Sequence, residues 1–285
     1  MNIVKSKRDL RSLVAGWKAN SEELGVVMTM GALHEGHLAL VEAACKDNDR
    51  VLATIFVNPR QFDNKADLET YPIDTNEDLR KLKAAGVDAV YLPQVEEIYP
   101  EGYSTTVSVA AMQDCLCGAT RPGHMDGVTT VVSKLLIQIG PDRAYYGQKD
   151  FQQYLLIQRV ARDLDLQVDV IGVPTIREGD NLALSSRNRR LDEAQRKIAP
   201  TLFKVESTIA DLIIQGEAAD HVLEWGRKFI HDAGFDKIDY LEIRSEEYLT
   251  LMGENSSREE LLGSRVFVAA WLGNTRLIDN LSISR

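Results

Sequence analysis

GVVMTMGALHEGHLALVEAAC, residues 25–45, joins the pattern of a buried strand to that of a helix. Its first part is an apolar run, residues 26–28, and its second part places Leu33, Leu40 and Val41 at helical spacing. This change of period predicts a strand covered on both faces that leads directly into a helix. In α/β folds, ligands bind beyond the carboxyl ends of such strands.

Two histidines lie at the start of the predicted helix. His34 and His37 are three positions apart, so they share one side of its first turn. The unpaired amides and positive dipole of a helix N-terminus favour a phosphate, and two imidazoles add hydrogen-bond donors. A single histidine on an apolar helix face is more often a capping or core residue, and His37 shares the face of Leu33 and Leu40. The pair, close to Gly31, favours a nucleotide-phosphate site.

The alternation of strand and helix continues on both sides of this stretch. Near-continuous apolar runs such as residues 51–57 indicate strands covered on both faces. Thr75 is the expected N-cap of a helix with Asp78 at its third position. Gly86 is expected to end this helix. Strands are predicted at residues 2–4, 26–28, 51–57, 89–92, 144–146 and 168–173, and helices at residues 7–19, 76–85, 128–139 and 151–164. The short connections predict an α/β fold with a doubly wound, Rossmann-like parallel sheet.

The pattern changes near Thr175, where a polar, basic loop begins. Helical patterns then run to residue 215 and over residues 219–233, and strands are predicted at residues 238–243, 266–272 and 275–281. Gly273 and Asn274 suit a two-residue hairpin turn between the last two strands. The sequence thus predicts a Rossmann-like domain over residues 1–175 and a smaller α+β domain over residues 176–285.

Residues 99–126 form an irregular stretch rich in Gly and Pro. A long connection of this kind in a compact domain is often an active-site cover. We expect this segment and the loop at Ser185 to close over the site.

The composition is that of a soluble globular protein. The chain has 285 residues, of which 44% are hydrophobic and 27% charged, and its formal net charge is −10. Nucleic-acid surfaces need clustered Lys and Arg, which an acidic chain does not favour. Three cysteines (Cys45, Cys115 and Cys117) do not suggest a disulfide framework, and no apolar run reaches membrane-spanning length. We therefore expect a cytoplasmic protein that binds neither nucleic acid nor membrane.

Two further loops carry residues suited to a nucleotide. Lys149 is a point-charge binder of phosphate that follows a predicted strand, and the adjacent Asp150 would accept hydrogen bonds from ribose hydroxyls. A solvated helix start explains these two residues equally well. Ser185, Ser186 and Arg187 offer hydroxyls, amides and a guanidinium to a phosphate, although such a tripeptide is common in surface loops.

Five motifs occur in order along the chain. They are MGALHEGH at residues 30–37, FVNPRQF at 56–62, RPGHMDGVTTVVSKLL at 121–136, GQKD with FQQ at 147–153, and LSSRN at 184–188. Together they resemble the pantothenate synthetase (pantoate–beta-alanine ligase) family. The first and last resemble the HxGH and KMSKS-type signatures of the class I aminoacyl-tRNA synthetase and nucleotidyltransferase superfamily. The chain departs from the family pattern at Met28, Gly179 and Leu184, where Pro, Pro and Met are common.

The resemblance implies an AMP-forming ligase that acts in two steps. ATP and the pantoate carboxylate give pantoyl adenylate and pyrophosphate, and the amine of beta-alanine then displaces AMP. The expected small-molecule partners are pantoate, beta-alanine and ATP, and the expected metal cofactor is Mg2+. Members of the family are homodimers through the larger domain, so a homodimer is expected here.

The resemblance also assigns roles to residues. Catalysis is expected from His34, His37, Lys149 and Arg187. Contacts to ATP are expected from Met30, Gly31, His34, His37, Gly147, Lys149, Asp150, Ile176, Leu184, Ser185, Ser186 and Arg187. Pantoate and beta-alanine are expected to bind Asn58, Gln61 and Gln153. Asp78 is a candidate for placing the metal, although a helix-capping role explains it equally well.

Two other functions stay open at this point. A nucleotidyltransferase would share the HxGH motif and the second loop, but nothing in its chemistry needs the pair Gln61 and Gln153. A catalytically relict nucleotide-binding protein would tolerate loss of Lys149 or His34, and both are present. Release of AMP that requires beta-alanine separates the ligase from both alternatives.

Overall fold

The computed structural model describes residues 1–62, 68–69 and 71–284. The chain divides into two compact units. The first comprises Met1–Gln148 and Gln152–Pro174, and the second comprises Lys149–Phe151 and Thr175–Arg285. Lys149–Phe151 therefore belong to the second unit, although residues of the first unit flank them in the sequence.

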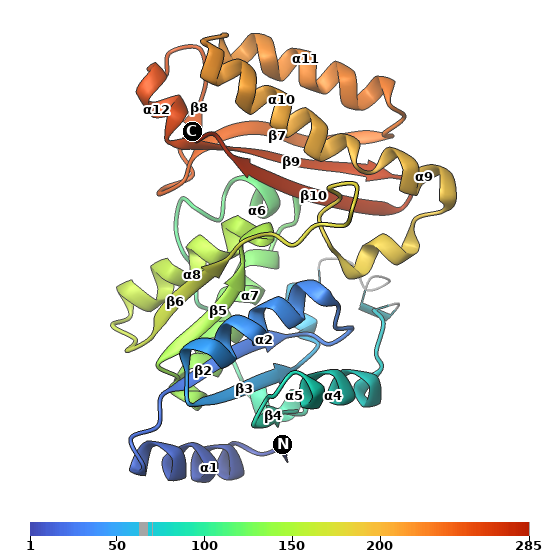
Figure 1. Ribbon diagram of the computed structural model, residues 1–285. Helices are drawn as coiled ribbons and strands as arrows, with labels where there is room; N and C mark the ends of the chain where they lie inside the picture. Colours follow the sequence, from blue (N-terminus) through green and yellow to red (C-terminus); the bar gives the residue numbers. More distant parts are fainter. Residues whose placement is uncertain (63–67, 70, 285) are drawn as a thin grey trace. The chain divides into compact units, whose positions relative to one another are not determined.

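A six-stranded parallel sheet organises the first unit, in the order β1-β4-β3-β2-β5-β6 (Figure 1). Its strands are β1 (Asn2–Val4), β2 (Leu24–Thr29), β3 (Arg50–Ile55), β4 (Ala89–Tyr91), β5 (Arg143–Gly147) and β6 (Asp169–Val173). All neighbouring pairs are parallel. The chain passes from β2 to β3 and β4 in one direction and from β5 to β6 in the other, so the strand order reverses between β2 and β5. The predicted doubly wound sheet is confirmed.

Helices cover both faces of this sheet. Among the described residues, the helices between these strands are α1 (Lys7–Ala19), α2 (Glu35–Asp47), α4 (Thr75–Ala84), α5 (Val95–Ile98), α6 (Leu116–Thr120), α7 (His124–Ile139) and α8 (Phe151–Asp163), with the 3-10 turns η1 (Pro59–Gln61) and η2 (Gln148–Asp150). The consecutive residues Val26 and Val27 of β2 are fully buried and belong to different apolar clusters. Val26 shares its cluster with Leu10 of α1, and Val27 shares its cluster with Val41 of α2. Burial on both faces explains the unbroken apolar run of the strand.

The predicted cap of helix α4 is wrong by one residue. Its N-cap is Asp74, whose side chain accepts a hydrogen bond from the Glu77 amide, so Thr75 is the first helical residue. Asp and Thr both cap helices well, so the sequence pattern does not show which of the adjacent residues Asp74 and Thr75 is the N-cap. The capping role considered for Asp78 is therefore taken by Asp74.

The predicted start of helix α7 is also wrong. The helix begins at His124 rather than at residue 128, after Gly123 in the left-handed conformation with φ 79°. Its first turn, residues 124–127, lacks the apolar period that marks the rest of the helix. The stretch over residues 99–126, predicted to be irregular, also contains the short helix α6.

The second unit is built on a four-stranded antiparallel sheet in the order β10-β9-β7-β8. Its elements are η3 (Ser186–Arg190), α9 (Glu193–Ile198), α10 (Thr201–Gln215), α11 (Ala219–Asp232), β7 (Lys237–Ser245), β8 (Leu251–Met252), α12 (Arg258–Leu262), β9 (Ser264–Leu272) and β10 (Thr275–Ser282). Thr275 pairs with Leu272, which confirms the hairpin turn at Gly273 and Asn274. Strand β8 was not predicted because two residues show no period. Helices α10 and α11 pack together and against the sheet (Figure 1).

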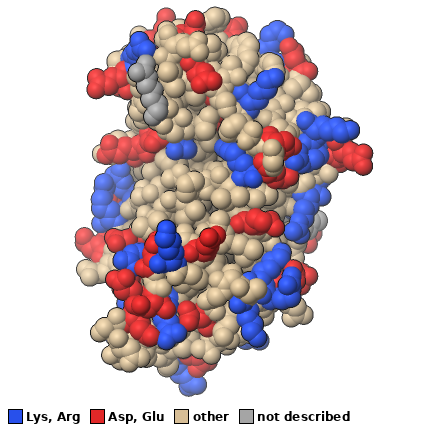
Figure 2. Space-filling model, viewed as in Figure 1, with Lys and Arg blue, Asp and Glu red and all other residues tan. Residues whose placement is uncertain are grey.

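Charged residues of both signs are scattered over the face seen in Figure 2, among the other residues that form most of it. They are interspersed, so neither sign dominates that face, although the formal net charge of the chain is −10. Within the part of the chain that the structure describes, no helix combines the length and the apolar character that a membrane span requires.

A carboxyl group is enclosed in the core of the second unit. Glu206 of α10 is fully buried, and neither carboxyl oxygen has a hydrogen-bond partner among the described residues. Burial raises the pKa of Glu206 well above its ordinary value, and repulsion from Asp279 adds to this rise, against the attraction of Arg177 and Arg265. The folded protein therefore holds a proton on Glu206 over a range where the unfolded chain has released it.

Glu206→Gln removes this ionisation. Stability of the parent protein should fall as pH rises above the ordinary pKa of Glu206, because only the unfolded chain releases the proton there. We expect the variant to gain stability relative to the parent by up to about 1.4 kcal/mol per pH unit in that window. Urea unfolding between about pH 5 and about pH 8 measures the difference. A difference that does not change with pH would contradict this assignment.

Candidate active site

The turn between β2 and α2 has an unusual backbone. Gly31 and Ala32 both have positive φ, at 83° and 52°. At Gly31 a side chain would also collide, since a Cβ built there lies 2.8 Å from Asp78 Oδ2. Glycine is thus required at the first of these positions, both by its conformation and by the close approach of a carboxylate.

Asp78 holds this turn from helix α4. Its side chain is 2% exposed, and its two oxygens accept the amides of Ala32 at 2.9 Å and Leu33 at 2.8 Å. Lys81, one turn further along α4, donates to the Leu33 carbonyl at 2.7 Å. Helix α4 therefore supports the approach to α2, and Asp78 acts on the backbone of the turn rather than as a cap of its own helix.

The two histidines form a capping box at the start of α2. His34 is the N-cap, and its Nδ1 accepts the Gly36 amide at 3.1 Å. His37 is the third helical residue, and its Nδ1 accepts the His34 amide at 3.4 Å. The ring centroids are 4.1 Å apart. Because both Nδ1 atoms accept, the proton of each neutral ring is assigned to Nε2.

A second turn, after β3, gathers three of the predicted residues. Asn58 is 1% exposed, and its amide nitrogen donates to Gln61 Oε1 and to the Gly127 carbonyl, both at 3.0 Å. Gln61 Nε2 lies 3.0 Å from the sulfur of Met30. The hydroxyl of Tyr99 donates to Asn58 Oδ1 at 2.8 Å, and burial raises the pKa of Tyr99 to about 12, which keeps it a donor. The structure therefore brings Met30, Asn58 and Gln61 together.

Residues of the RPGHMDG motif hold this turn, whereas the sequence suggested for their stretch only a cover over the site. His124 Nδ1 lies 2.6 Å from the Gln61 carbonyl, and Arg121 Nη1 lies 3.1 Å from His124 Nε2. Since the guanidinium can only donate, Nε2 accepts and Nδ1 carries the proton to Gln61. Gly127 permits the close approach, because a Cβ there would lie 2.3 Å from the Arg60 carbonyl oxygen. The motif itself was the only signal in the sequence.

Gly147 and Gln153 complete the predicted residues of the first unit. Gly147 ends β5, beside the point where the strand order reverses, and pairs with Val173. Gln153 is half-buried on the first turn of α8. Among the described residues, no hydrogen bond joins Gln153 to Gln61. The adjacent Gln152 is a structural residue, with its amide nitrogen bonded to the carbonyls of residues 112 and 115.

The other predicted residues belong to the second unit. The Leu184 amide donates to the Ile176 carbonyl at 3.0 Å, which closes a hairpin-like loop. Ser185 then caps η3 by accepting the Arg187 amide at 3.2 Å, and Ser186 is the first residue of that turn. The Asn188 side chain donates back to this loop. Lys149 and Asp150 lie in the separate segment Lys149–Phe151.

Two of the three departures from the family pattern have a clear setting. Met28 lies in β2, where its sulfur accepts from the Tyr146 hydroxyl at 3.5 Å. Gly179 has open space around a built Cβ, so the fold does not require glycine there. The third, Leu184, contributes the backbone hydrogen bond that closes its loop.

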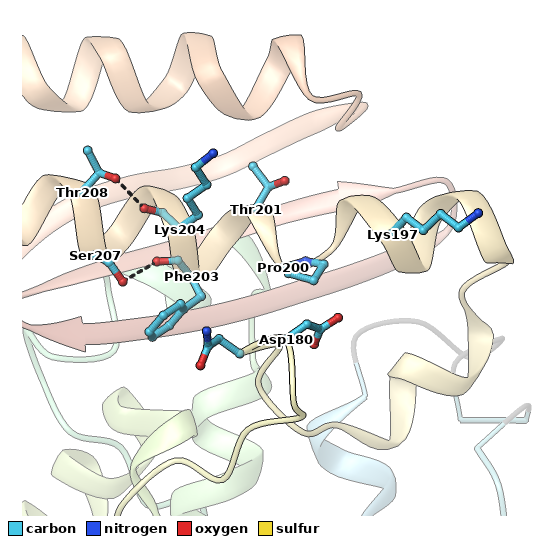
Figure 3. Close-up of a pocket in the computed structure, with 9 residues that line it drawn as sticks. Asp180, Lys197, Pro200, Thr201, Phe203, Lys204, Ser207 and Thr208 are labelled. Carbon is cyan, nitrogen blue, oxygen red and sulfur yellow. Dashed lines mark hydrogen bonds between the residues drawn. The ribbon is translucent and has the colours of Figure 1, made fainter.

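A groove of about 460 Å³ lies beside α10 in the second unit (Figure 3). Lys197 and Lys204 line it, with Phe203 between them in the sequence. The hydroxyls of Ser207 and Thr208 already donate to carbonyls of their own helix. None of the predicted site residues lines this groove, so it is not the candidate active site.

Comparison with known proteins identifies the family. The sequence profile described as Pantoate-beta-alanine ligase matches residues 2–282. The chain is 48% identical over 281 residues to the pantothenate synthetase of Roseobacter denitrificans, covering 99% of this chain and 97% of the relative. It is 47% identical over 284 residues to that of a Chelativorans species, covering 99% and 98%.

The chain belongs to the pantoate–beta-alanine ligase family. It is accordingly a ligase of pantothenate biosynthesis, which condenses pantoate with beta-alanine. Solved structures agree with this assignment. The pantothenate synthetase of Thermus thermophilus matches with a TM-score of 0.92 and 41% identity, over 100% of both chains. A pantoate-beta-alanine ligase from Francisella tularensis, complexed with beta-gamma ATP and beta-alanine, matches with a TM-score of 0.82 and 32% identity, over 99% and 98% of the chains.

Asp78→Asn tests whether this carboxylate holds the β2–α2 turn of the ligase. The substitution keeps the size of the side chain but turns an NH₂ group toward a backbone N–H. We expect a loss of about 2–3 kcal/mol in unfolding free energy and faster hydrogen exchange at Ala32 and Leu33. Asp74→Asn is the matched control on the same helix, because Asn caps as well as Asp. Unchanged exchange at both amides would contradict this role.

Proposed function

We propose that the chain joins pantoate to beta-alanine through a pantoyl-adenylate intermediate. In the first step a pantoate carboxylate oxygen bonds to the α-phosphorus of ATP, and the bond to pyrophosphate breaks. In the second step the beta-alanine nitrogen bonds to the acyl carbon, AMP leaves with its oxygen, and the amine gives up a proton. Family membership supports the overall reaction, and the ligands of the Francisella relative support ATP as the co-substrate.

The observation that carries this proposal is the imidazole pair at the N-terminus of α2. Attack of a carboxylate on a triphosphate brings two anions together, so donors must be aimed at the developing charge. His34 and His37 are held through Nδ1 by backbone amides, which assigns a proton to Nε2 of each neutral ring. Their position follows β2, next to the reversal of strand order where doubly wound sheets bind ligands. We assign both residues to the phosphates.

Three residues of the second unit supply further donors. Lys149 and Arg187 are cations, and Ser186 adds a hydroxyl at the start of η3. We assign Lys149 and Arg187 to the charge that develops on the departing pyrophosphate, because a cation there stabilises the transition state more than the ground state. The remaining ATP contacts are proposed for Met30, Gly31, Gly147, Asp150, Ile176, Leu184 and Ser185.

The turn at Asn58 and Gln61 is proposed to bind pantoate, with Gln153 as a second amide. Neutral amides suit the hydroxyls and carboxylate of pantoate, since a fixed positive charge would stabilise the carboxylate and slow its attack. The packing of Gln61 against Met30, and the bonds from Asn58 and His124, support a rigid arrangement. Pre-organised polar groups of this kind orient a small substrate without a large entropy cost.

Magnesium is proposed as the counter-ion of the triphosphate, where it would neutralise phosphate charge. Among the described residues no group of three or more His, Cys, Asp or Glu side chains could hold a metal ion. The Asp78 carboxylate accepts two backbone amides, and its part in placing the metal stays a prediction. Mg2+ commonly binds through substrate phosphates and water rather than in a protein cage.

A cytoplasmic homodimer remains part of the proposal.

Lys149→Ala and His37→Ala should each lower the rate of adenylate formation by about 100-fold or more, the cost of removing a transition-state donor. His37→Gln is the matched control for folding, since Gln at the third helical position keeps the capping box while removing the imidazole. Single-turnover release of pyrophosphate from ATP and pantoate measures the step. Parent rates in the two Ala variants would overturn the assigned roles.

Gln61→Ala should raise the KM for pantoate by about 10- to 100-fold, because the amide is lost from a partly buried polar contact, and should leave the KM for ATP near the parent value. Gln158→Ala is a control that removes an amide bonded to Tyr154, away from the Asn58 turn. Equal increases in both KM values would show that Gln61 acts on the whole site rather than on pantoate.

The reaction itself is tested by following AMP and pyrophosphate with ATP, magnesium and pantoate, with and without beta-alanine. Steady AMP release that requires both pantoate and beta-alanine is expected for the two-step ligase. Pyrophosphate release that is indifferent to pantoate would instead indicate a nucleotidyltransferase. Binding of ATP without turnover would indicate a relict site.

A further inference from the structure

The segment that carries Lys149 contacts the antiparallel sheet of the second unit through side chains of β9 and β10. Asn280 of β10 donates from Nδ2 to the Lys149 carbonyl at 2.8 Å. The guanidinium of Arg265 lies over the Phe151 ring, with its carbon 4.0 Å from the ring centroid. The Phe151 and Phe267 ring centroids are 6.0 Å apart. The backbone of Lys149 is therefore fixed by residues far from it in the sequence.

The register of the sheet explains why these contacts share one face. Asn280 pairs directly with Phe267 across the β9–β10 ladder, and Arg265 lies two residues from Phe267 on β9. Side chains two apart on a strand point to the same face. Arg265, Phe267 and Asn280 thus form one platform under residues Lys149–Phe151.

Asn280 is itself held in one orientation. It is 3% exposed, and its Oδ1 accepts from Arg265 Nη1 at 2.6 Å. Arg265 is 8% exposed and is bound on its other side by Glu246, whose Oε1 lies 3.1 Å from the Arg265 Nε. An arginine has only donors, so it can bond only to the oxygen of the Asn280 amide. The NH₂ group of Asn280 is thereby directed at the Lys149 carbonyl.

We propose that Asn280 is a positioning residue for Lys149 in the ligase reaction. Its oriented amide anchors the backbone from which the lysine side chain extends. A fixed backbone limits the positions that the ammonium can take when the triphosphate binds. This inference rests on the proposed role of Lys149 in adenylate formation. A displacement of about 1 Å at such a group is enough to lower the rate by about 100-fold.

Asn280→Asp is the sharpest test, because Asp keeps the oxygen that Arg265 needs and replaces the donor to Lys149 with a second oxygen. Repulsion between this oxygen and the Lys149 carbonyl should displace the segment. We expect the rate of adenylate formation to fall by about 10- to 100-fold, with the KM for pantoate unchanged. Ser264→Ala is the matched control: Ser264 is also fully buried, and its hydroxyl donates to the Leu261 carbonyl at 2.6 Å, away from Lys149.

A double-mutant cycle separates positioning from general destabilisation. If Asn280 acts through Lys149, then Asn280→Asp should cause no further loss of rate in a Lys149→Ala background. Losses that multiply would overturn the proposal, and so would a parent rate in Asn280→Asp. Should Asn280→Asp fail to fold, Asn280→Ser, which is too short to reach the Lys149 carbonyl, enters the same cycle. A parent rate in Lys149→Ala alone would overturn the role of Lys149, which is a separate result.

Discussion

The candidate site of the first unit depends on the pair of hydrogen bonds that Asp78 accepts from Ala32 and Leu33. A non-glycine residue with positive φ, such as Ala32, costs on the order of 1 kcal/mol or more. Two charge-assisted bonds at 2.9 and 2.8 Å contribute about 1.5–3 kcal/mol each, so they outweigh this cost. The carboxylate also fills the space that a side chain at Gly31 would need. This arrangement fixes the turn, and the turn in its place sets the start of α2 and the positions of His34 and His37.

The parallel sheet was largely predictable because its inner strands β2, β3 and β4 are buried on both faces. Val26 and Val27 point to opposite sides of the sheet and are both fully buried, so the apolar run marks the strand without ambiguity. The predicted helix starts were wrong where the local sequence pattern does not distinguish neighbouring positions. Asp74 and Thr75 are both good caps, and the helix that Asp74 caps is the one that carries Asp78 to the β2–α2 turn. The start of α7 is likewise marked by Gly123 in the left-handed conformation and not by a hydrophobic period.

For the candidate site, the sequence indicated which residues to expect, but it did not indicate the hydrogen bonds that hold them in place. The sequence presented capping and phosphate binding as alternatives for His34 and His37. The structure places both rings in a capping box through Nδ1, and phosphate binding through the opposite ring edge is compatible with that cap. Arg121 and His124 escaped prediction because the contact of His124 with Gln61 spans 63 residues of sequence. Spacing along the chain carries no information about such a contact.

The same design is found at Lys149, whose carbonyl is bonded by a side chain 131 residues away. A cation that must meet a phosphate is poorly served by a carboxylate partner, because an ion pair would neutralise the charge that the reaction uses. Anchoring the backbone avoids this conflict, since it fixes the origin of the side chain and leaves its charge available. Asp78 acts on the turn before His34 in the same way, through amides and not through the imidazole. In both places a buried polar group from a distant element supports the main chain, at Lys149 itself and at the two residues just before His34.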